Sequence, residues 1–502
     1  MKKWAKILAG IAVVAAVIWS GLWYAGKGEI EARMDAELAH LAQAGDKVRF
    51  ATREVGGFPF GYEVTLTDVE VDTGQDLISI RMPSTVSRAD LSAPDRLVTA
   101  LPSAFTVTFR PTEEMRAANT VLAEEMLFEV ETVAGEIITA GLPGFNRSLD
   151  VVAESLLIVH SQEERNTHLA VEFAEMAWET VLPAEPAEGD VRSSGQIGFL
   201  DYVFTGRGDA DQLVTVESQS NDIQFTGAYE RGAQGQQGTL EELISSMNYL
   251  AGETVTRFAT ESASEGQPGG AVTLTSGTAS ATLALNAGQL EVRGETRGNR
   301  WELLPDDADL PYRGAVDIDI IDMIYRAPFA PSEDMQPFDL KFAMAGFQPE
   351  QSVWSIFDAE ERLDRSPAEM TVDFEGTMRL TKAQSQLRPG EAPPLEFGNL
   401  VVNRIDLSAL GATAKAKGNV EFLQPINVPM GRITLRLNQV VEVMTKMVEA
   451  QILTPDVLLM GSIISQTYLT EDPESGELIA EIEMGPEGVT VNGKPIGAPA
   501  AR

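Results

Sequence analysis

The sequence predicts a mainly β (α+β) fold. We expect one or more large twisted antiparallel sheets, which can curl into a trough, together with a few packing helices and one N-terminal transmembrane helix. Many segments alternate apolar and polar residues with period two, few follow a helical period, and one apolar stretch near the N-terminus lacks charge. With 502 residues, the chain is too long for one compact core, so we expect two or more domains or an elongated sheet.

The N-terminal segment Ile7–Gly26 has the length and composition of a membrane span. It carries no charged residue, and about 20 helical residues cross the ~30 Å hydrocarbon layer. Lys2, Lys3 and Lys6 precede it, so the positive-inside rule keeps the N-terminus cytoplasmic. We therefore expect residues 1–27 to form a cytoplasmic lip and a single-pass inner-membrane anchor, with the main body in the periplasm.

Three aromatic residues, Trp19, Trp23 and Tyr24, lie at the far end of this segment, where amphipathic rings favour the membrane interface. The alternative is a cleaved secretion signal, which has a shorter apolar core and ends in small residues. The bulky aromatics occupy the place where cleavage would be needed, so the retained anchor is preferred. Both alternatives export the rest of the chain.

The residues after the anchor suggest a stalk and two β-rich regions. Apolar residues at helical spacing predict a stalk helix over 28–45, which ends at Gly45. A β-rich region is expected over 46–235 and a second over 236–502, with a short helix, Thr239–Leu250, near the boundary. The second region should contain helices near 350–363 and 439–465. The range 439–465 should hold two helices, the second of which begins at Thr454-Pro455, a cap residue followed by proline at the first helical position.

The strand that covers residues 62–71 has an irregular pattern. Its apolar residues form two alternating sets that are out of step by one position: Tyr62, Val64 and Leu66, then Val69 and Val71. A slip of one residue moves side chains to the opposite face unless a bulge absorbs it. We therefore predict a bulge at Thr67–Asp68.

Composition excludes several functions. The 75 Asp+Glu against 38 Lys+Arg give a formal net charge of −37, which repels phosphate backbones, so no nucleic-acid partner is expected. The alternative that assigns no specific function to this acidity is that it keeps the protein soluble. There is no cysteine, so disulfides, thiolate metal sites and cysteine nucleophiles are excluded.

No catalytic, cofactor or metal motif stands out, and none is predicted. His40, His160 and His168 lack the spacing of metal ligands and are expected to face solvent. Met460-Gly461-Ser462 only partly resembles a nucleophile elbow and fits a helix-packing site better. Among the acidic clusters, Asp317 and Asp319 alternate with apolar residues and are expected on the solvent face of a strand.

The segment Gly57-Phe58-Pro59 before the strand 62–71 carries a family resemblance. An anchor, a stalk helix and this motif in that order resemble an alphaproteobacterial family of membrane-anchored envelope proteins, the domain of unknown function 2125 (DUF 2125). Three further segments look similar to that family: Ala93–Pro102, Trp354–Pro367 and Gly488–Ile496. The resemblance implies location and architecture but no activity. For Phe58-Pro59 a rigid turn is preferred over a ligand site.

Two functions remain open at this point. The first is a non-enzymatic envelope protein whose curved sheet binds lipid or another apolar envelope component, as a carrier or scaffold. Its structural alternative is a sheet whose apolar face is packed shut by helices. The second function is an anchored periplasmic hydrolase that uses two carboxylates, although no pair can be selected among 75 acidic residues.

Overall fold

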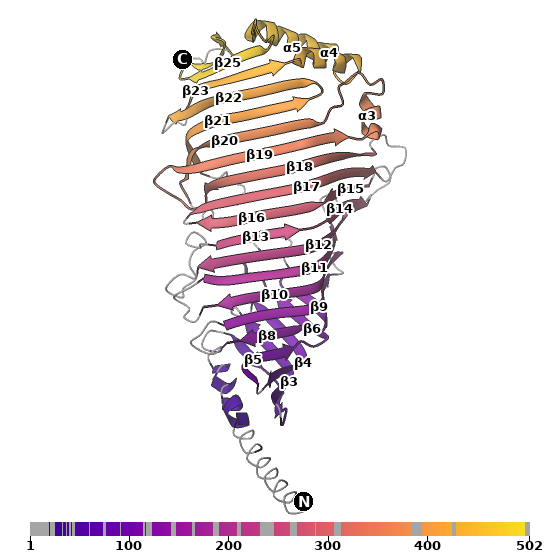
Figure 1. The fold of residues 1–502 in the computed structure, drawn as a ribbon, viewed down its shortest axis with the longest axis vertical. Coiled ribbons are helices and arrows are strands. Elements are labelled where there is room, and N and C mark those ends of the chain that lie inside the picture. Colours follow the sequence, from indigo (N-terminus) through magenta and orange to yellow (C-terminus); the bar gives the residue numbers. More distant parts are fainter. Residues whose placement is uncertain are drawn as a thin grey trace, which may run out of the picture. The chain divides into compact units, whose positions relative to one another are not determined.

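The fold is described by a computed structural model in which the chain forms two compact units, unit 1 (Met1–Arg207) and unit 2 (Gly208–Arg502). Both units consist mainly of antiparallel strands (Figure 1). The structure describes residue 20, residues 26–42 in part, and residues 46–496 outside the following gaps: 60, 74–76, 91, 114–115, 117–122, 142–146, 163–165, 184–189, 208–211, 231–244, 262–268, 287, 306–312, 383–393 and 424–427.

The predicted anchor lies almost wholly outside the described residues, and so do Trp19, Trp23, Tyr24 and His40. No helix in the described part of the chain combines the length and the apolar composition needed to cross a membrane. Within the predicted stalk, the described residues from 28 to 42 are helical. The expected boundary at 235–236 falls in the gap 231–244, whereas the two units divide at Arg207–Gly208.

Unit 1 contains eleven named strands in its described residues. They are β1 (Lys47–Arg49), β2 (Thr52–Gly56), β3 (Gly61–Thr73), β4 (Ile78–Asp90), β5 (Ala93–Ala100), β6 (Ala104–Phe109), β7 (Met126–Val133), β8 (Glu136–Ala140), β9 (Arg147–Gln162), β10 (Thr167–Leu182) and β11 (Asp190–Arg207). β1 and β2 pair with successive parts of β3, and β3 pairs with β4. β5 and β6 pair with successive parts of β4, and β7 and β8 pair with successive parts of β9. Along β4 and along β9, the two shorter strands therefore take the place of one long strand with a break. β9, β10 and β11 then follow as neighbours.

Unit 2 repeats this arrangement with longer strands. They are β12 (Leu213–Glu230), β13 (Ser245–Ala251), β14 (Thr254–Glu261), β15 (Gly270–Ser276), β16 (Thr278–Asn286), β17 (Gln289–Pro305), β18 (Gly314–Pro328), β19 (Gln336–Pro349), β20 (Ala368–Leu380), β21 (Leu395–Ala409), β22 (Ala412–Leu423), β23 (Val428–Asn438), β24 (Thr470–Glu471), β25 (Leu478–Gly485), β26 (Gly488–Val491) and β27 (Lys494–Pro495). β13 and β14 pair with successive parts of β12, and β15 and β16 with successive parts of β17. From β17 to β23 each strand pairs with the next, and β25 pairs with β23.

Three named helices lie in unit 2: α3 (Gln351–Phe357), α4 (Val440–Glu449) and α5 (Pro455–Tyr468). α3 lies within the range expected near 350–363, and α4 and α5 correspond to the two helices expected over 439–465. The helix expected over Thr239–Leu250 is wrong for its described part, because residues 245–250 belong to β13. Pairing with β12 on one side and β16 on the other outweighs the local helical pattern.

Positive-φ residues interrupt long strands part-way along their length. They are Asp68 in β3, Glu175 in β10, Asp222 in β12, Gly298 in β17 and Gly346 in β19. A residue with a left-handed backbone conformation interrupts the alternation of side chains between the two faces of a strand. Apolar residues at even positions before it and at odd positions after it, or the reverse, then point to the same side of the sheet. Figure 1 shows β14 and β15 turned away from β13 and β16 at such an interruption in unit 2.

The bulge predicted at Thr67–Asp68 is therefore partly wrong. Asp68 does adopt a left-handed conformation, with φ of 49°. The register, however, does not slip, because Thr67 pairs with Ser84 and Val69 pairs with Met82. The change of parity thus comes from a local backbone rotation, and no extra residue is inserted. The same register is kept on both sides of Glu175 in β10.

Candidate functional site

One side of the sheet in unit 2 is apolar across neighbouring strands. Residues directly opposite each other on paired strands point to the same side of a sheet. The register places the following residues in one row, each opposite the next: Met247, Leu283, Val292, Tyr325, Leu340, Phe374, Val402, Gly418, Ile433 and Ile482. A second row runs beside it: Gly294, Met323, Phe342, Val372, Ile405, Ala416, Leu435 and Ala480. These two rows are called the apolar face of unit 2, and they contain no charged residue.

The opposite side of the same strands is charged. Cross-strand ion pairs lie on it, among them Arg326–Asp339 at 2.9 Å and Lys341–Asp373 at 3.5 Å. A few apolar residues also lie on this side, such as Ile324, whose register neighbours are Arg293 and Lys341. This side is called the charged face, and exposed pairs of this kind contribute little to stability. The sheet is therefore sharply two-sided, with its charges turned to water.

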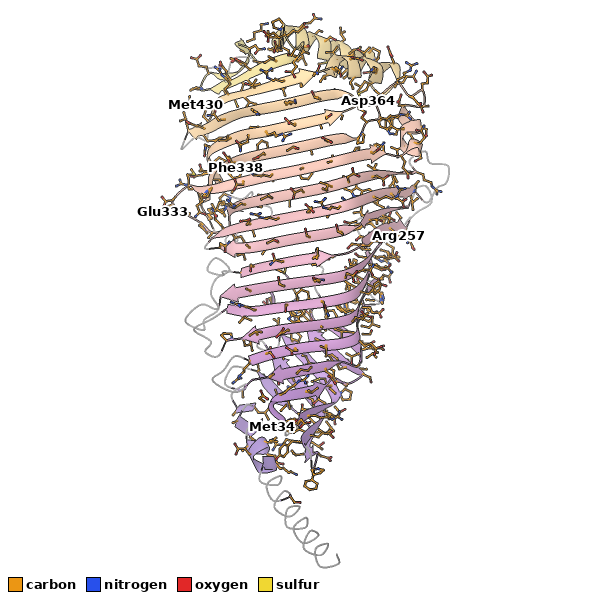
Figure 2. All side chains as sticks on the ribbon, viewed as in Figure 1. Met34, Arg257, Glu333, Phe338, Asp364 and Met430 are labelled. Atoms are coloured by element: carbon orange, nitrogen blue, oxygen red, sulfur yellow. The ribbon has the colours of Figure 1, made fainter. Side chains whose placement is uncertain are left out.

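The named helices contact only some strands of the apolar face. α3 packs against β18 and β19 near their ends, α4 packs against β22, and α5 packs against α4. Exposure varies along the face: Met247 is 51% exposed and Met323 is 38% exposed, whereas Val402, Ala416 and Ala480 are buried. A small cluster of buried apolar residues, Ala327, Phe338 and Met378, lies near one end of the strands, where Figure 2 labels Phe338. A monomeric protein rarely leaves so wide an apolar surface uncovered unless it is an interaction site.

Unit 1 has an apolar face built in the same way. Its central row is Phe105, Val130, Ile158, Val171 and Tyr202, each opposite the next on β6, β7, β9, β10 and β11. Beyond the interruption at Glu175, the apolar residues of β10 stand at even positions instead of odd ones. Trp178 lies in this part of the strand and is 44% exposed. The two units thus use the same design on their own strands.

A hollow of about 650 Å³ opens in unit 1 beside the interruption at Asp68. It is lined from β3, β4, β6 and β7 by the apolar residues Val69, Met82, Phe105 and Val130 together with acidic side chains and Arg81. Its volume lies within the range of small-molecule pockets, ~300–1,000 Å³. Its lining continues the apolar face of unit 1.

The histidines divide between two roles. His160 is buried, its Nδ1 lies 2.7 Å from the carbonyl oxygen of Leu127, and its ring lies 5.0 Å from that of Phe128. The expectation that it faces solvent is therefore wrong, because its strand position places it on the apolar side of the sheet. His168 is exposed and lies 2.9 Å from the hydroxyl of Ser161.

No metal site emerges in the described part of the chain, which holds no group of three His, Asp or Glu residues suited to an ion. Asp317 and Asp319 are exposed on β18, as the alternation predicts. Gly461 of the Met460-Gly461-Ser462 segment lies inside α5, where an added Cβ would be 2.6 Å from Cε of Met444 on α4. Gly461 therefore lies at the contact between α4 and α5, whereas Met460 is exposed.

The Gly57-Phe58-Pro59 segment connects β2 and β3. Gly57 has φ of 93°, and a Cβ there would be 2.8 Å from the backbone nitrogen of Glu63, so only glycine fits without strain. The Phe58–Pro59 peptide bond is cis, and Phe58 is 51% exposed. These features describe a tight connection between paired strands.

Asp358, directly after α3, organises the loop that leads to β20. Its carboxylate is buried and accepts backbone N–H bonds from Arg362 at 2.9 Å and Leu363 at 3.1 Å. Arg365 approaches it at 3.5 Å and places its guanidinium 5.3 Å from the Trp354 ring. Burial raises the pKa of Asp358, but these hydrogen bonds and the positive charge outweigh it, so the pKa is lowered from its ordinary value. This constellation has a structural role at the end of the sheet.

Comparison with known proteins gives one match. A family model described as "Uncharacterized protein conserved in bacteria (DUF2125)" matches residues 23–296. The matched range includes Gly57-Phe58-Pro59 and Ala93–Pro102, and it ends before the similar-looking segments Trp354–Pro367 and Gly488–Ile496. No curated protein and no solved structure matches the chain.

Proposed function

The chain belongs to the uncharacterised bacterial family DUF2125, and within that family we propose that it is a non-enzymatic binding protein whose apolar sheet faces hold the acyl chains of lipids. The observation that carries the proposal is the uncharged apolar face that crosses ten strands of unit 2 and is in part open to solvent, most of all at Met247, Met323 and Tyr325. Acyl chains need no hydrogen bond or ion pair from the protein, so a surface without polar groups suits them.

The charges on the opposite side support the same proposal. A sheet of this width would aggregate through its apolar side if that side met water in the working state. Lipid on the apolar face removes that surface from water, while the charged face keeps the complex dispersed. The net charge of −37 disfavours attraction to anionic headgroups, so the contact with lipid should be made by acyl chains.

The proposed location is the inner membrane of a bacterium. The uncharged segment Ile7–Gly26 would be a single-pass anchor with a cytoplasmic N-terminus, and the two units would lie in the periplasm. There they would bind lipid, or an apolar envelope component, next to the membrane that supplies it. No nucleic acid, metal or cofactor takes part in this proposal.

Lipid carried by the full chain tests the proposal. The full chain and an anchor-only chain of residues 1–45 are extracted and exchanged into the same detergent, and the lipid per protein molecule is measured by mass spectrometry. Since the anchor-only chain accounts for lipid held around the transmembrane helix, the full chain should carry at least about threefold more lipid. Equal amounts in both samples would remove the proposed function.

A further inference from the structure

Helix α5 exposes large apolar side chains to solvent. A helix at the surface of a globular protein normally buries its apolar stripe and exposes its polar side. In α5, the half-buried side contains Leu458, Gly461, Ser462, Ser465 and Tyr468, and the helix packs on α4, where Gly461 approaches Met444. The exposed side carries five large apolar residues: Val457, Leu459, Met460, Ile463 and Ile464.

The exposure of these five side chains is unusually high. Leu459 is 60% exposed and Met460 is 64% exposed, and no residue of α5 is buried. Small side chains at the α4 contact allow the two helices to approach closely, which fixes the apolar side of α5 outward. The outward direction therefore follows from the packing of the hairpin.

Size and charge decide what covers this side. Together the five side chains offer roughly 500 Å², less than the ~800 Å² that each partner buries in a standard protein–protein interface. A second copy of the chain would therefore gain too little area for a stable dimer through this surface. The only charged residue of α5 is Asp456 in the first turn. The exposed side of α5 therefore has no arrangement of charges that would be complementary to a protein partner.

We propose that α5 lies in the surface of a lipid bilayer, with Val457, Leu459, Met460, Ile463 and Ile464 inserted among the acyl chains. Shallow insertion of an apolar helix side needs no complementary shape and is strong in proportion to the apolar area inserted. The segment that follows α5 carries Glu471, Asp472 and Glu474, which would be repelled by anionic headgroups. The bilayer that α5 meets should accordingly be rich in zwitterionic lipid.

The absence of cysteine makes a local test straightforward. The full chain carrying Ile463→Cys is labelled with an environment-sensitive fluorophore and reconstituted into phosphatidylcholine vesicles. The matched control is Thr445→Cys, an exposed position on α4 of the same hairpin. Because the fluorophore is read at one position, the N-terminal segment can insert in both samples without affecting the comparison.

The probe at position 463 should shift to shorter wavelength and be quenched by brominated lipid at least about threefold more strongly than the probe at position 445. Partial replacement of phosphatidylcholine by phosphatidylglycerol should weaken the quenching at position 463. If the 463 probe is quenched by aqueous iodide and not by brominated lipid, the proposal is overturned. A probe shielded from both quenchers would also overturn it, since protein would then cover α5. None of these outcomes depends on lipid in the sheet faces, so the proposed function is tested separately.

Discussion

Met323→Glu is expected to lower the affinity of the full chain for a fluorescently labelled phospholipid by at least about tenfold. Met323 lies in the second row of the apolar face of unit 2, between Gly294 and Phe342. A carboxylate placed against acyl chains loses its hydration without gaining a partner, and tenfold corresponds to only ~1.4 kcal/mol of that cost. Since Met323 is 38% exposed, the charge can reach water when lipid is absent, and folding should be little affected.

The adjacent residue provides the control for this prediction. Ile324→Glu introduces the same group one position along β18, on the charged face, where Arg293 and Lys341 are its register neighbours. This variant should keep the affinity of the unchanged protein. Equal loss of affinity in both variants would show that lipid does not distinguish the two faces of the sheet. Circular dichroism of both variants checks that the strands are retained.

Asp358→Asn is expected to lower the free energy of unfolding by about 2–4 kcal/mol, measured by urea unfolding at pH 7. The amide offers one acceptor where two backbone N–H groups now bind, and it leaves Arg365 without its buried partner. Glu360→Ala is the matched control, because Glu360 is an exposed carboxylate that pairs with Arg362 on the same loop. The decrease in unfolding free energy caused by Glu360→Ala should stay below about 1 kcal/mol.

The lowered pKa of Asp358 predicts how this difference changes with pH. The carboxylate contributes stability above the unfolded pKa of about 3.9, and that contribution is lost as pH falls through the lower folded pKa. The difference in unfolding free energy between the unchanged protein and Asp358→Asn should therefore be constant near neutral pH and shrink below about pH 4. If this difference in unfolding free energy is the same at pH 7 and at pH 3, the assigned role of the ionised carboxylate is contradicted.

Local patterns in the sequence predicted much of the fold. Alternation of apolar and polar residues predicted the antiparallel strands, and helical spacing with Thr454-Pro455 predicted the start of α5. The change of parity between Leu66 and Val69 correctly located an irregularity, now seen as the left-handed Asp68. The sequence alone could not distinguish an inserted residue from a backbone rotation, since both shift the alternation by one position.

The candidate site could be predicted only in part. Each strand showed one apolar side, but a face exists only once the register places Met323 beside Phe342 and Phe342 beside Val372. Register depends on pairings between distant segments, which periodicity does not contain. His160 was misjudged for a related reason: its burial comes from Leu127 and Phe128 on a different strand. The exposed apolar side of α5 likewise depends on which side packs against α4.

The claim that lipid lies on one face of the sheet is tested most directly by photo-crosslinking in living cells. A benzophenone amino acid is placed at position 323 or at position 324 of the full chain, and the adducts are identified by mass spectrometry after irradiation. Lipid adducts should form at position 323, and position 324 should give few or none, because the two side chains point to opposite faces. Lipid adducts in equal yield at both positions, or none at position 323, would contradict the account.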